Sequence, residues 1–399
     1  MMKSYWDFSI VLCGLALVPG LDATALGQQE PRGQVESSSR RPDSQPVPGP
    51  AASESAAGEV PVAPVVNAVV RPWMAKNQAP GVIVVVRREG KTHFFPLGMA
   101  DAARGRPVTA DTIFELASVT KVFTTTSLAM EVEAGRMRLK DSVAQYIPAL
   151  RGGGDIRDVT LEELATHTSS LPRTPGVKEP PQGWNKQHVL QWAARWRAPY
   201  PPGTKSLYSN VALGILGFAI AEREERPLLA VWREQFLGPL GMRNTFFEIP
   251  AEARPLVAQG YGPQGKPVPH DPIGGWPGGG RLSSSGRDMA EFLTANMNET
   301  RNVPAITSAM QFAQRPFFAA SEKMTQGLCW QRVQLQGQLV IDKNGGLTGT
   351  STYIGMLPEH HTGVVVMANR GKCQATAVGR KLLMALIARE HDEATPDEE

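Results

Sequence analysis

The chain has 399 residues, of which 42% are apolar, and it carries a formal net charge of +3 at pH 7. This length suits one large domain or two, with a substantial buried core. The small net charge and the lack of a long basic run argue against a nucleic-acid-binding protein, so no nucleic acid is expected among its partners.

The N-terminus has the pattern of a secretory signal peptide. Lys3 precedes an apolar run over residues 8–18, and Ala25 and Gly27 are small residues at the −3 and −1 positions before Gln28. The run is short for a bilayer span; an uncleaved membrane anchor is the alternative. We predict a cleaved signal peptide over residues 1–27 and a secreted or periplasmic protein.

Residues 28–59 are rich in Pro, Ser, Gln, Gly and Ala and nearly lack large apolar side chains. Such a segment cannot bury enough surface to offset its ordering entropy, so a disordered linker is predicted. The folded domain is expected over residues 60–390, and an acidic tail over residues 391–399.

The two ends of this domain predict strands, whereas its middle predicts helices. After a short helix, β-branched residues on both sides of a Glu-Gly turn indicate a hairpin. The predicted helices cover 65–76, 119–134, a segment starting at Thr160, 187–197, 211–223, 228–237, a segment starting at Ser285, and 375–389; the predicted strands cover 81–88, 91–98, 326–335, 338–343, 350–357 and 363–368.

This order predicts an α+β fold. One antiparallel sheet is formed from both chain termini and flanked by helices, with an all-helical domain inserted at about residues 135–300.

The first chemical motif is Ser118-x-x-Lys121, at the start of a predicted helix. Residues three apart on a helix share a face, so the Lys121 amine can lie beside the Ser118 hydroxyl. A desolvated lysine can take the proton of a serine nucleophile. The alternative is an N-cap serine followed by a solvated lysine.

The second motif is Tyr208-Ser209-Asn210, in a loop just before a helix. Tyr208 can exchange a proton with the serine or the leaving group, and Asn210 can bond a substrate amide. The alternative is an Asn210 N-cap after an ordinary loop tyrosine.

The third motif is Lys343-Asn344-Gly345-Gly346, at the end of a predicted strand. The lysine gives a positive charge facing a cleft, and the glycines let a substrate backbone approach closely. The alternative is a hairpin turn with Asn-Gly at its tip.

Together, in this order, the three motifs resemble those of the serine β-lactamase and penicillin-binding-protein superfamily. The chain is most similar to class C β-lactamases and their low-molecular-weight penicillin-binding and esterase relatives. The similarity covers roughly residues 60–390 and includes the stretches 164–172, 239–242, 326–330 and 367–369.

The resemblance implies a role for each matched residue. Ser118 would be the acylated nucleophile, and Lys121 and Tyr208 would handle its proton and later activate water. Asn210 would contact the substrate amide, and Lys343 would complete the positive cluster around Tyr208. The backbone N–H groups of Ser118 and Gly346 would form the oxyanion hole.

The chain departs from the class pattern on the anion-binding side. Asn344 replaces the usual hydroxyl residue that helps to hold the substrate carboxylate, and Thr174 replaces a glutamine. The carboxylate-recognition stretch falls on residues 371–377, where Gln374 is present but Ala377 stands in place of an arginine.

The sequence lacks the motifs of two other classes of hydrolase. The chain has no G-x-S-x-G and no H-E-x-x-H motif, which disfavours an α/β-hydrolase and a zinc hydrolase. His167 is expected to be structural, and His360 and His361 to be solvated in a turn. No cofactor and no metal are expected. Cys329 and Cys373, the cysteines after residue 27, would either form a disulfide or lie buried as small apolar residues.

The resulting prediction is an exported serine hydrolase that opens β-lactams through a Ser118 acyl-enzyme and contributes to antibiotic resistance. The same serine could instead act on D-Ala-D-Ala peptides of peptidoglycan or on simple esters. A third alternative is a penicillin-binding sensor without turnover. We expect a monomer.

Overall fold

The computed structural model describes residues 61–177, 183–270 and 275–392. The predicted signal peptide and linker lie outside these residues, as does the acidic tail beyond Asp392. The helices are α1 (Val62–Asn77), α2 (Thr120–Glu133), α3 (Val143–Tyr146), α4 (Leu161–Ala165), α5 (Lys186–Ala193), α6 (Asn210–Arg223), α7 (Leu228–Trp232), α8 (Gly286–Asn296), α9 (Pro304–Ala313) and α10 (Ala375–Asp392).

The strands divide into one large sheet and two small ones. They are β1 (Gly81–Arg88), β2 (Lys91–Asp101), β3 (Arg106–Pro107), β4 (Ile113–Glu115), β5 (Thr245–Phe246), β6 (Gly260–Tyr261), β7 (Pro267–Val268), β8 (Ser283–Ser285), β9 (Phe318–Ser321), β10 (Met324–Gln326), β11 (Gln331–Leu335), β12 (Gln338–Gly346), β13 (Ser351–Leu357) and β14 (Thr362–Ala368).

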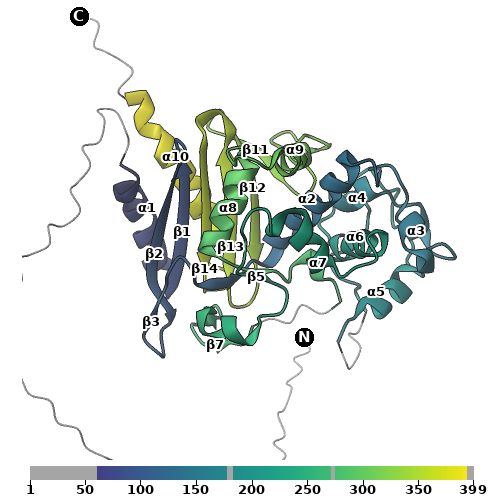
Figure 1. Cartoon of the computed structure of the whole chain (residues 1–399), viewed down its shortest axis with the longest axis horizontal. Coiled ribbons are helices and arrows are strands. Elements are labelled where there is room, and N and C mark those ends of the chain that lie inside the picture. The colour runs from purple at the N-terminus through teal and green to yellow at the C-terminus, as the bar shows by residue number, and fades with distance from the viewer. Residues whose placement is uncertain (1–60, 178–182, 271–274, 393–399) are drawn as a thin grey trace, which may run out of the picture. The chain divides into compact units, whose positions relative to one another are not determined.

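The large sheet joins both ends of the domain, as predicted. Its order is β3-β2-β1-β14-β13-β12-β11-β10-β9, and every pairing in it is antiparallel. Strand β1 pairs with β14, with Val84 opposite Val366. Figure 1 shows this sheet with the helical part of the chain beside it. The α+β fold is thereby confirmed.

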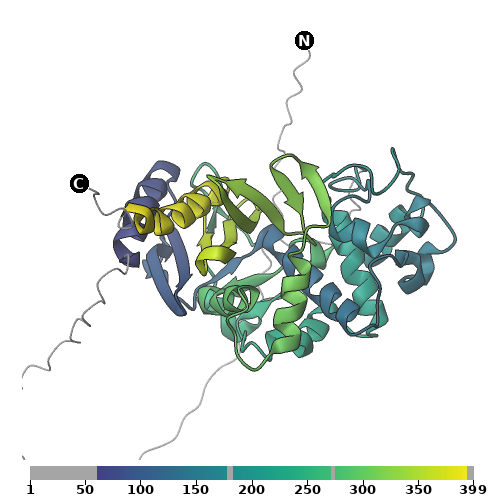
Figure 2. The same cartoon turned by 90° about the horizontal axis from the view of Figure 1, so that it is seen from above.

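Strand β1 is buried on both faces because the sheet lies between two layers of helices (Figure 2). Ile83 and Val85 belong to the core shared with α2 and α8, whereas the alternate residues Val82 and Val84 belong to the core beneath α1 and α10. Side chains alternate between the faces of a strand, so a continuous valine run fills both cores.

Helix α2 is buried on nearly all sides. Thr124, Thr125 and Thr126 are fully buried, and each hydroxyl donates to a backbone carbonyl. These bonds satisfy the polar groups that burial would otherwise leave unpaired. The helix that follows Ser118 therefore runs through the interior of the domain.

One predicted strand is wrong in extent. Residues 326–335 contain the last residue of β10 and the whole of β11, which are separated by Gly327–Trp330. Cys329 takes a φ of 60°, and its N–H donates to Ala165 O at 2.8 Å, while Leu328 N donates to Ala313 O at 2.8 Å. These bonds to the helical region replace ladder bonds, so the strand is interrupted.

Two helix predictions also differ at their ends. The segment 228–237 is α-helical only to Trp232 and continues as a π-helical turn over Arg233–Leu237. Helix α5 ends at Ala193, four residues before the predicted end. The helices predicted to start at Thr160 and Ser285 are capped by these two residues: Thr160 makes a full capping box with Glu163, and Ser285 Oγ accepts from Asp288 N.

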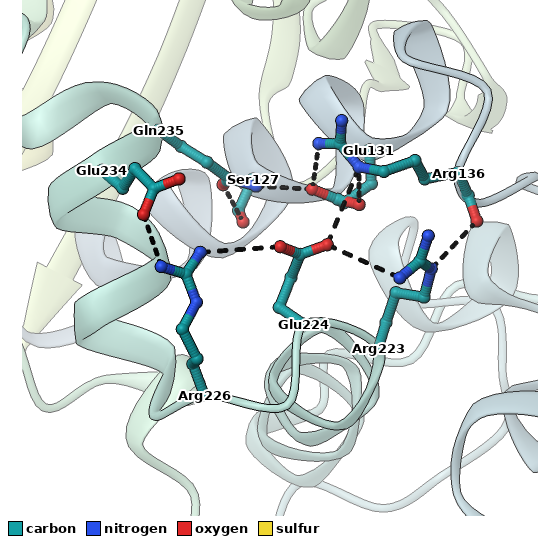
Figure 3. Close-up of polar contacts among 8 residues, drawn as sticks. All are labelled: Ser127, Glu131, Arg136, Arg223, Glu224, Arg226, Glu234 and Gln235. Atoms are coloured by element: carbon teal, nitrogen blue, oxygen red, sulfur yellow. Dashed lines mark hydrogen bonds and ion pairs between the residues drawn. The ribbon is translucent and has the colours of Figure 1, made fainter.

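A network of charged groups connects the C-terminal ends of α2 and α6 with the π-helical turn (Figure 3). The fully buried Glu131 accepts two hydrogen bonds from Arg136, at 2.8 and 2.6 Å, and one from Gln235. Arg136 also pairs with Glu224, which Arg223 and Arg226 approach at 3.9 and 3.6 Å. The network therefore fixes the spacing of the two helices at one end.

No helix of the described part combines the length and the apolar character needed to cross a bilayer.

Candidate active site

Ser118 lies in a tight turn between β4 and α2. Leu116 N donates to Leu282 O, and Thr352 Oγ1 donates to Leu116 O, both at 2.8 Å. Ala117 has a φ of 50°, a left-handed conformation that is strained for a non-glycine residue. These bonds to Leu282, just before β8, and to Thr352 in β13 hold Ser118 at the start of α2, where it lines a cleft.

Lys121 lies beside Ser118 and is fully buried. Its Nζ is 3.2 Å from Ser118 Oγ, and it donates to Asn210 Oδ1 at 2.7 Å and to the carbonyl oxygen of Gly279. The alternative of a solvated lysine is wrong, because the Lys121 side chain reaches no solvent. Gly279 had no predicted role, since nothing in the local sequence indicates which carbonyl a buried amine will meet.

Tyr208 contacts Ser118 from the opposite wall. Its O–H donates to Ser118 Oγ at 2.5 Å. Ser209 is the N-cap of α6: its Oγ accepts from Ala212 N at 3.0 Å and donates to Pro172 O at 2.7 Å. The alternative of an Asn210 N-cap is therefore wrong, and the Asn210 amide faces Lys121 instead.

The third motif lies inside strand β12 and not in a turn. Lys343 is buried, with Nζ 5.2 Å from the centroid of the Tyr208 ring. A side chain at Gly345 would overlap the carbonyl oxygen of Leu116 and lie 2.9 Å from Ser118 N. Only glycine allows β12 to pack so closely against the serine turn. The hairpin-tip alternative is wrong, since the turn follows at residues 347–350.

Burial and charge shift the proton affinities of these groups. Burial lowers the pKa of Lys121 well below its ordinary value, and the charge of Lys343 lowers it further. Burial also lowers the pKa of Lys343. Burial raises the pKa of Tyr208 to about 12, against an opposing effect of its hydrogen bond to Ser118. At neutral pH Tyr208 keeps its proton, whereas Lys121 is shifted towards the amine form that accepts one.

His167 lies behind Tyr208 and does not line the cleft. Its ring centroid is 4.6 Å from that of Tyr208, and its Nδ1 accepts from Ser209 N at 3.2 Å. Burial lowers the pKa of His167 well below its usual range, so the imidazole is neutral. The Sγ of Cys329 lies 3.8 Å from His167 Nε2. Cys329 and Cys373 are both free and buried, so they form no disulfide with each other.

His360 ends a 3-10 turn before β14 and His361 follows it, so the predicted turn forms, but only His361 is solvated as predicted. His361 is 75% exposed, and His360 is partly buried, with its Nε2 2.9 Å from Gln338 Oε1.

The cleft has a volume of about 860 Å³ and lies between the sheet and the helical part. The predicted site residues that line it are Ser118, Tyr208, Lys343, Asn344, Gly346 and Gln374. Lys121 and Asn210 do not line it, but Lys121 Nζ contacts both Ser118 Oγ and Asn210 Oδ1. Thr174 and Ala377 do not line it either. Two cations also line it: Arg173, which had no predicted role, and Lys372, which lies in the predicted carboxylate-recognition stretch but was not singled out there. Both lie on loops, where no periodicity indicates which way a side chain points.

No group of three or more His, Cys, Asp or Glu side chains within residues 61–177, 183–270 and 275–392 is arranged to hold a metal ion.

Comparison with known proteins identifies the family. Residues 66–389 match the Beta-lactamase family. The chain belongs to this family. A β-lactamase of Yersinia enterocolitica is 31% identical over 350 residues, which cover 78% of this chain and 88% of the relative; a β-lactamase of Pseudomonas fluorescens is 27% identical, with 79% and 95% covered.

Solved structures of similar fold include a class C β-lactamase from Rhodobacter sphaeroides, with a TM-score of 0.72, 26% identity, and 82% of this chain and 98% of that chain covered. The D-alanine carboxypeptidase AmpC from Burkholderia cenocepacia has a TM-score of 0.73 and 26% identity, with 82% and 99% covered. The fold is thus that of class C β-lactamases, and members of the family are hydrolases.

Proposed function

We propose that this protein is a serine hydrolase that opens the amide of β-lactams through an acyl-enzyme on Ser118. The observation that supports it most is the position of Ser118 Oγ, 2.5 Å from the Tyr208 hydroxyl and 3.2 Å from Lys121 Nζ. A base and a proton donor therefore both contact the nucleophile at Ser118 Oγ.

The contacts suggest how the proton moves. A neutral Lys121 amine has two N–H groups, which donate to Asn210 Oδ1 and Gly279 O, so its lone pair is left for the Ser118 proton. As the Ser118 Oγ–carbon bond forms, Lys121 takes that proton. The carbon–nitrogen bond then breaks, and the departing nitrogen receives the proton of Tyr208. Tyr208 is reprotonated from Lys121.

The backbone N–H groups of Ser118 and Gly346 are proposed as the oxyanion hole. Their donors would stabilise the negative oxygen of the tetrahedral intermediate, an effect typically worth about 3 kcal/mol of barrier for one donor. A water molecule would then release the acyl group, with Lys121 and Tyr208 as its proton acceptors.

The test is the intact mass of the mature protein at intervals after mixing with benzylpenicillin. Hydrolysed drug with a transient adduct supports a β-lactamase. Ser118→Ala should show neither adduct nor product while keeping its fold. Ser308→Ala is the matched control, because this serine lies exposed on α9 outside the cleft. Activity retained in Ser118→Ala would rule out the assignment.

A second candidate is a D-alanyl carboxypeptidase that uses the same serine. It is favoured by the carboxypeptidase name of one structural neighbour at 26% identity. Release of D-alanine from a peptide ending in D-Ala-D-Ala, with a persistent penicillin adduct, would identify it. A persistent adduct without D-alanine release would identify a sensor.

We also propose that the chain is exported, on the basis of residues 1–27 alone. Expression in a Gram-negative host should yield periplasmic protein whose N-terminus is Gln28. Recovery of the protein from the cytoplasm with residues 1–27 still attached would contradict this.

A further inference from the structure

The cleft has a one-sided charge. Arg173, Lys343 and Lys372 line it, and no aspartate or glutamate does so among the described residues. Within that part of the chain, neither Arg173 nor Lys372 makes an ion pair with a carboxylate. Two exposed cations that face a cleft without a carboxylate partner are available to an anionic ligand.

Arg173 stands on the wall that carries Tyr208 and Asn210. The central carbon of its guanidinium group lies 5.2 Å from the centroid of the Tyr208 ring. Its backbone oxygen accepts from Asn210 N at 3.0 Å, and the preceding Pro172 carbonyl accepts from Ser209 Oγ. The loop is therefore fixed next to Asn210, the residue expected to contact the amide on the acyl side of a substrate.

Lys372 stands on the sheet wall, in the connection between β14 and α10. Gly371 N donates to Tyr261 O at 2.9 Å, and Cys373 N donates to Ser351 Oγ at 3.2 Å, so both neighbours of Lys372 are tied to the fold. Lys372 has a φ of 58°, a left-handed conformation. It lies in the stretch 371–377, where Ala377 occupies the place of the class arginine and does not line the cleft.

We propose that this site selects acyl donors with an anionic group on each side of the scissile amide. A carboxylate on the leaving side is held by Lys372, which supplies the charge that Ala377 lacks. A second carboxylate, on the acyl side chain, is held by the guanidinium of Arg173. The proposal rests on Ser118 as the acylated residue. A guanidinium pairs with a carboxylate through two parallel hydrogen bonds, which gives direction as well as charge.

Two penicillins make a matched pair for the test. Benzylpenicillin and carbenicillin share the ring carboxylate, but carbenicillin carries one more carboxylate on its acyl side chain. The second-order rate constant of Ser118 acylation is measured for both by intact mass. We expect wild type to prefer carbenicillin, and Arg173→Gln to lower the carbenicillin-to-benzylpenicillin ratio about tenfold, equivalent to about 1.4 kcal/mol.

Lys372→Gln should lower the rate constants for both penicillins by a similar factor, because both carry the ring carboxylate. Arg195→Gln is the control for a lost positive charge, since Arg195 is exposed and lies outside the cleft; it should leave the ratio unchanged. A ratio that does not change in Arg173→Gln would overturn the acyl-side assignment, because an effect transmitted through Tyr208 would slow both penicillins equally. Unchanged rates in Lys372→Gln would overturn the leaving-side assignment.

Equilibrium binding to Ser118→Ala separates this inference from the proposed function. Carbenicillin should bind this variant about tenfold more tightly than benzylpenicillin by calorimetry. If wild type is not acylated but the variant keeps this preference, the proposed function fails and the charge recognition stands. Equal affinities, or no binding of either penicillin, would overturn the charge recognition.

Discussion

Helices α2 and α6 run side by side, and their two ends treat charge in opposite ways. At the C-terminal ends, Arg136 forms ion pairs with both Glu131 and Glu224. Each of the other charged side chains shown in Figure 3 also lies next to a side chain of opposite charge. At the N-terminal ends lie two buried lysines, Lys121 of α2 and Lys343 of the neighbouring strand β12. Neither forms an ion pair with a carboxylate of the described residues.

The difference separates charges that stabilise the fold from charges that are available for proton transfer. Burying a charge costs free energy unless a partner compensates for it. The paired end meets that requirement and fixes the helices. At the cleft end the buried lysines have no carboxylate partner, and the free-energy cost of burying the Lys121 charge lowers the pKa of this group. Groups with such shifts gather where proton transfer is needed.

The largest expected effect is on catalysis, in Lys121→Met. Loss of the proposed base should slow acylation by benzylpenicillin about 10²–10⁴-fold, the usual range for general base catalysis. Stability should not fall, because methionine fills a similar volume without a buried charge. Acylation by intact mass and a urea unfolding curve are measured on the same protein. A normal acylation rate would remove Lys121 from the mechanism.

The opposite outcome is expected at the paired end, in Glu131→Ala. The variant leaves the Arg136 guanidinium and the Gln235 amide without their acceptor. Breaking a buried pair typically costs about 3–5 kcal/mol, and because Arg136 is 41% exposed we expect about 2–4 kcal/mol. Unfolding in urea measures this cost.

The folded fraction of Glu131→Ala should acylate at close to the wild-type rate, since the network touches no residue of the cleft. Arg243→Ala, a change outside the network, is the control for the loss of a charged side chain. A Glu131→Ala protein as stable as wild type would show that the pairs do not hold the helices.

The buried, unpaired Lys121 should also affect how the stability of the protein depends on pH. The pKa of Lys121 is lower in the folded than in the unfolded state, so at this group the unfolded state binds more protons. The contribution of Lys121 to wild-type stability therefore falls as the pH decreases from about 10.5. Lys121→Met lacks this group. Its stability advantage should therefore grow as the pH falls from 10 to 7, by up to about 1.4 kcal/mol per pH unit. Parallel stability curves for the two proteins would contradict a desolvated amine.

The sequence predicted what depends on local spacing. Ser118 and Lys121 meet because they are three residues apart at a helix start, and β1 and β14 meet because the valine runs at both chain ends need burial on two faces. Tyr208 could be placed near them only through the resemblance, since 90 residues separate it from Ser118.

The remaining site residues depend on contacts between distant loops. Arg173 faces the cleft because Ser209 and Asn210 bind its loop, and Lys372 does so because Tyr261 and Ser351 bind the chain on either side of it. No periodicity or motif encodes such contacts. The strand break at Cys329 has the same origin, since its N–H is bound by a helix end far away in sequence.

The smallest expected effect tests how far the paired end extends. Glu234 pairs with Arg226 at the outer side of the network, where their side chains are 69% and 39% exposed. Water and salt screen such a pair, and holding two long side chains together costs entropy. Glu234→Gln should therefore leave the urea midpoint unchanged at physiological ionic strength, in contrast to Glu131→Ala. A loss comparable to that of Glu131→Ala would mean that the network acts as one cooperative unit, in which the exposed pair holds Arg226 in place for Glu224.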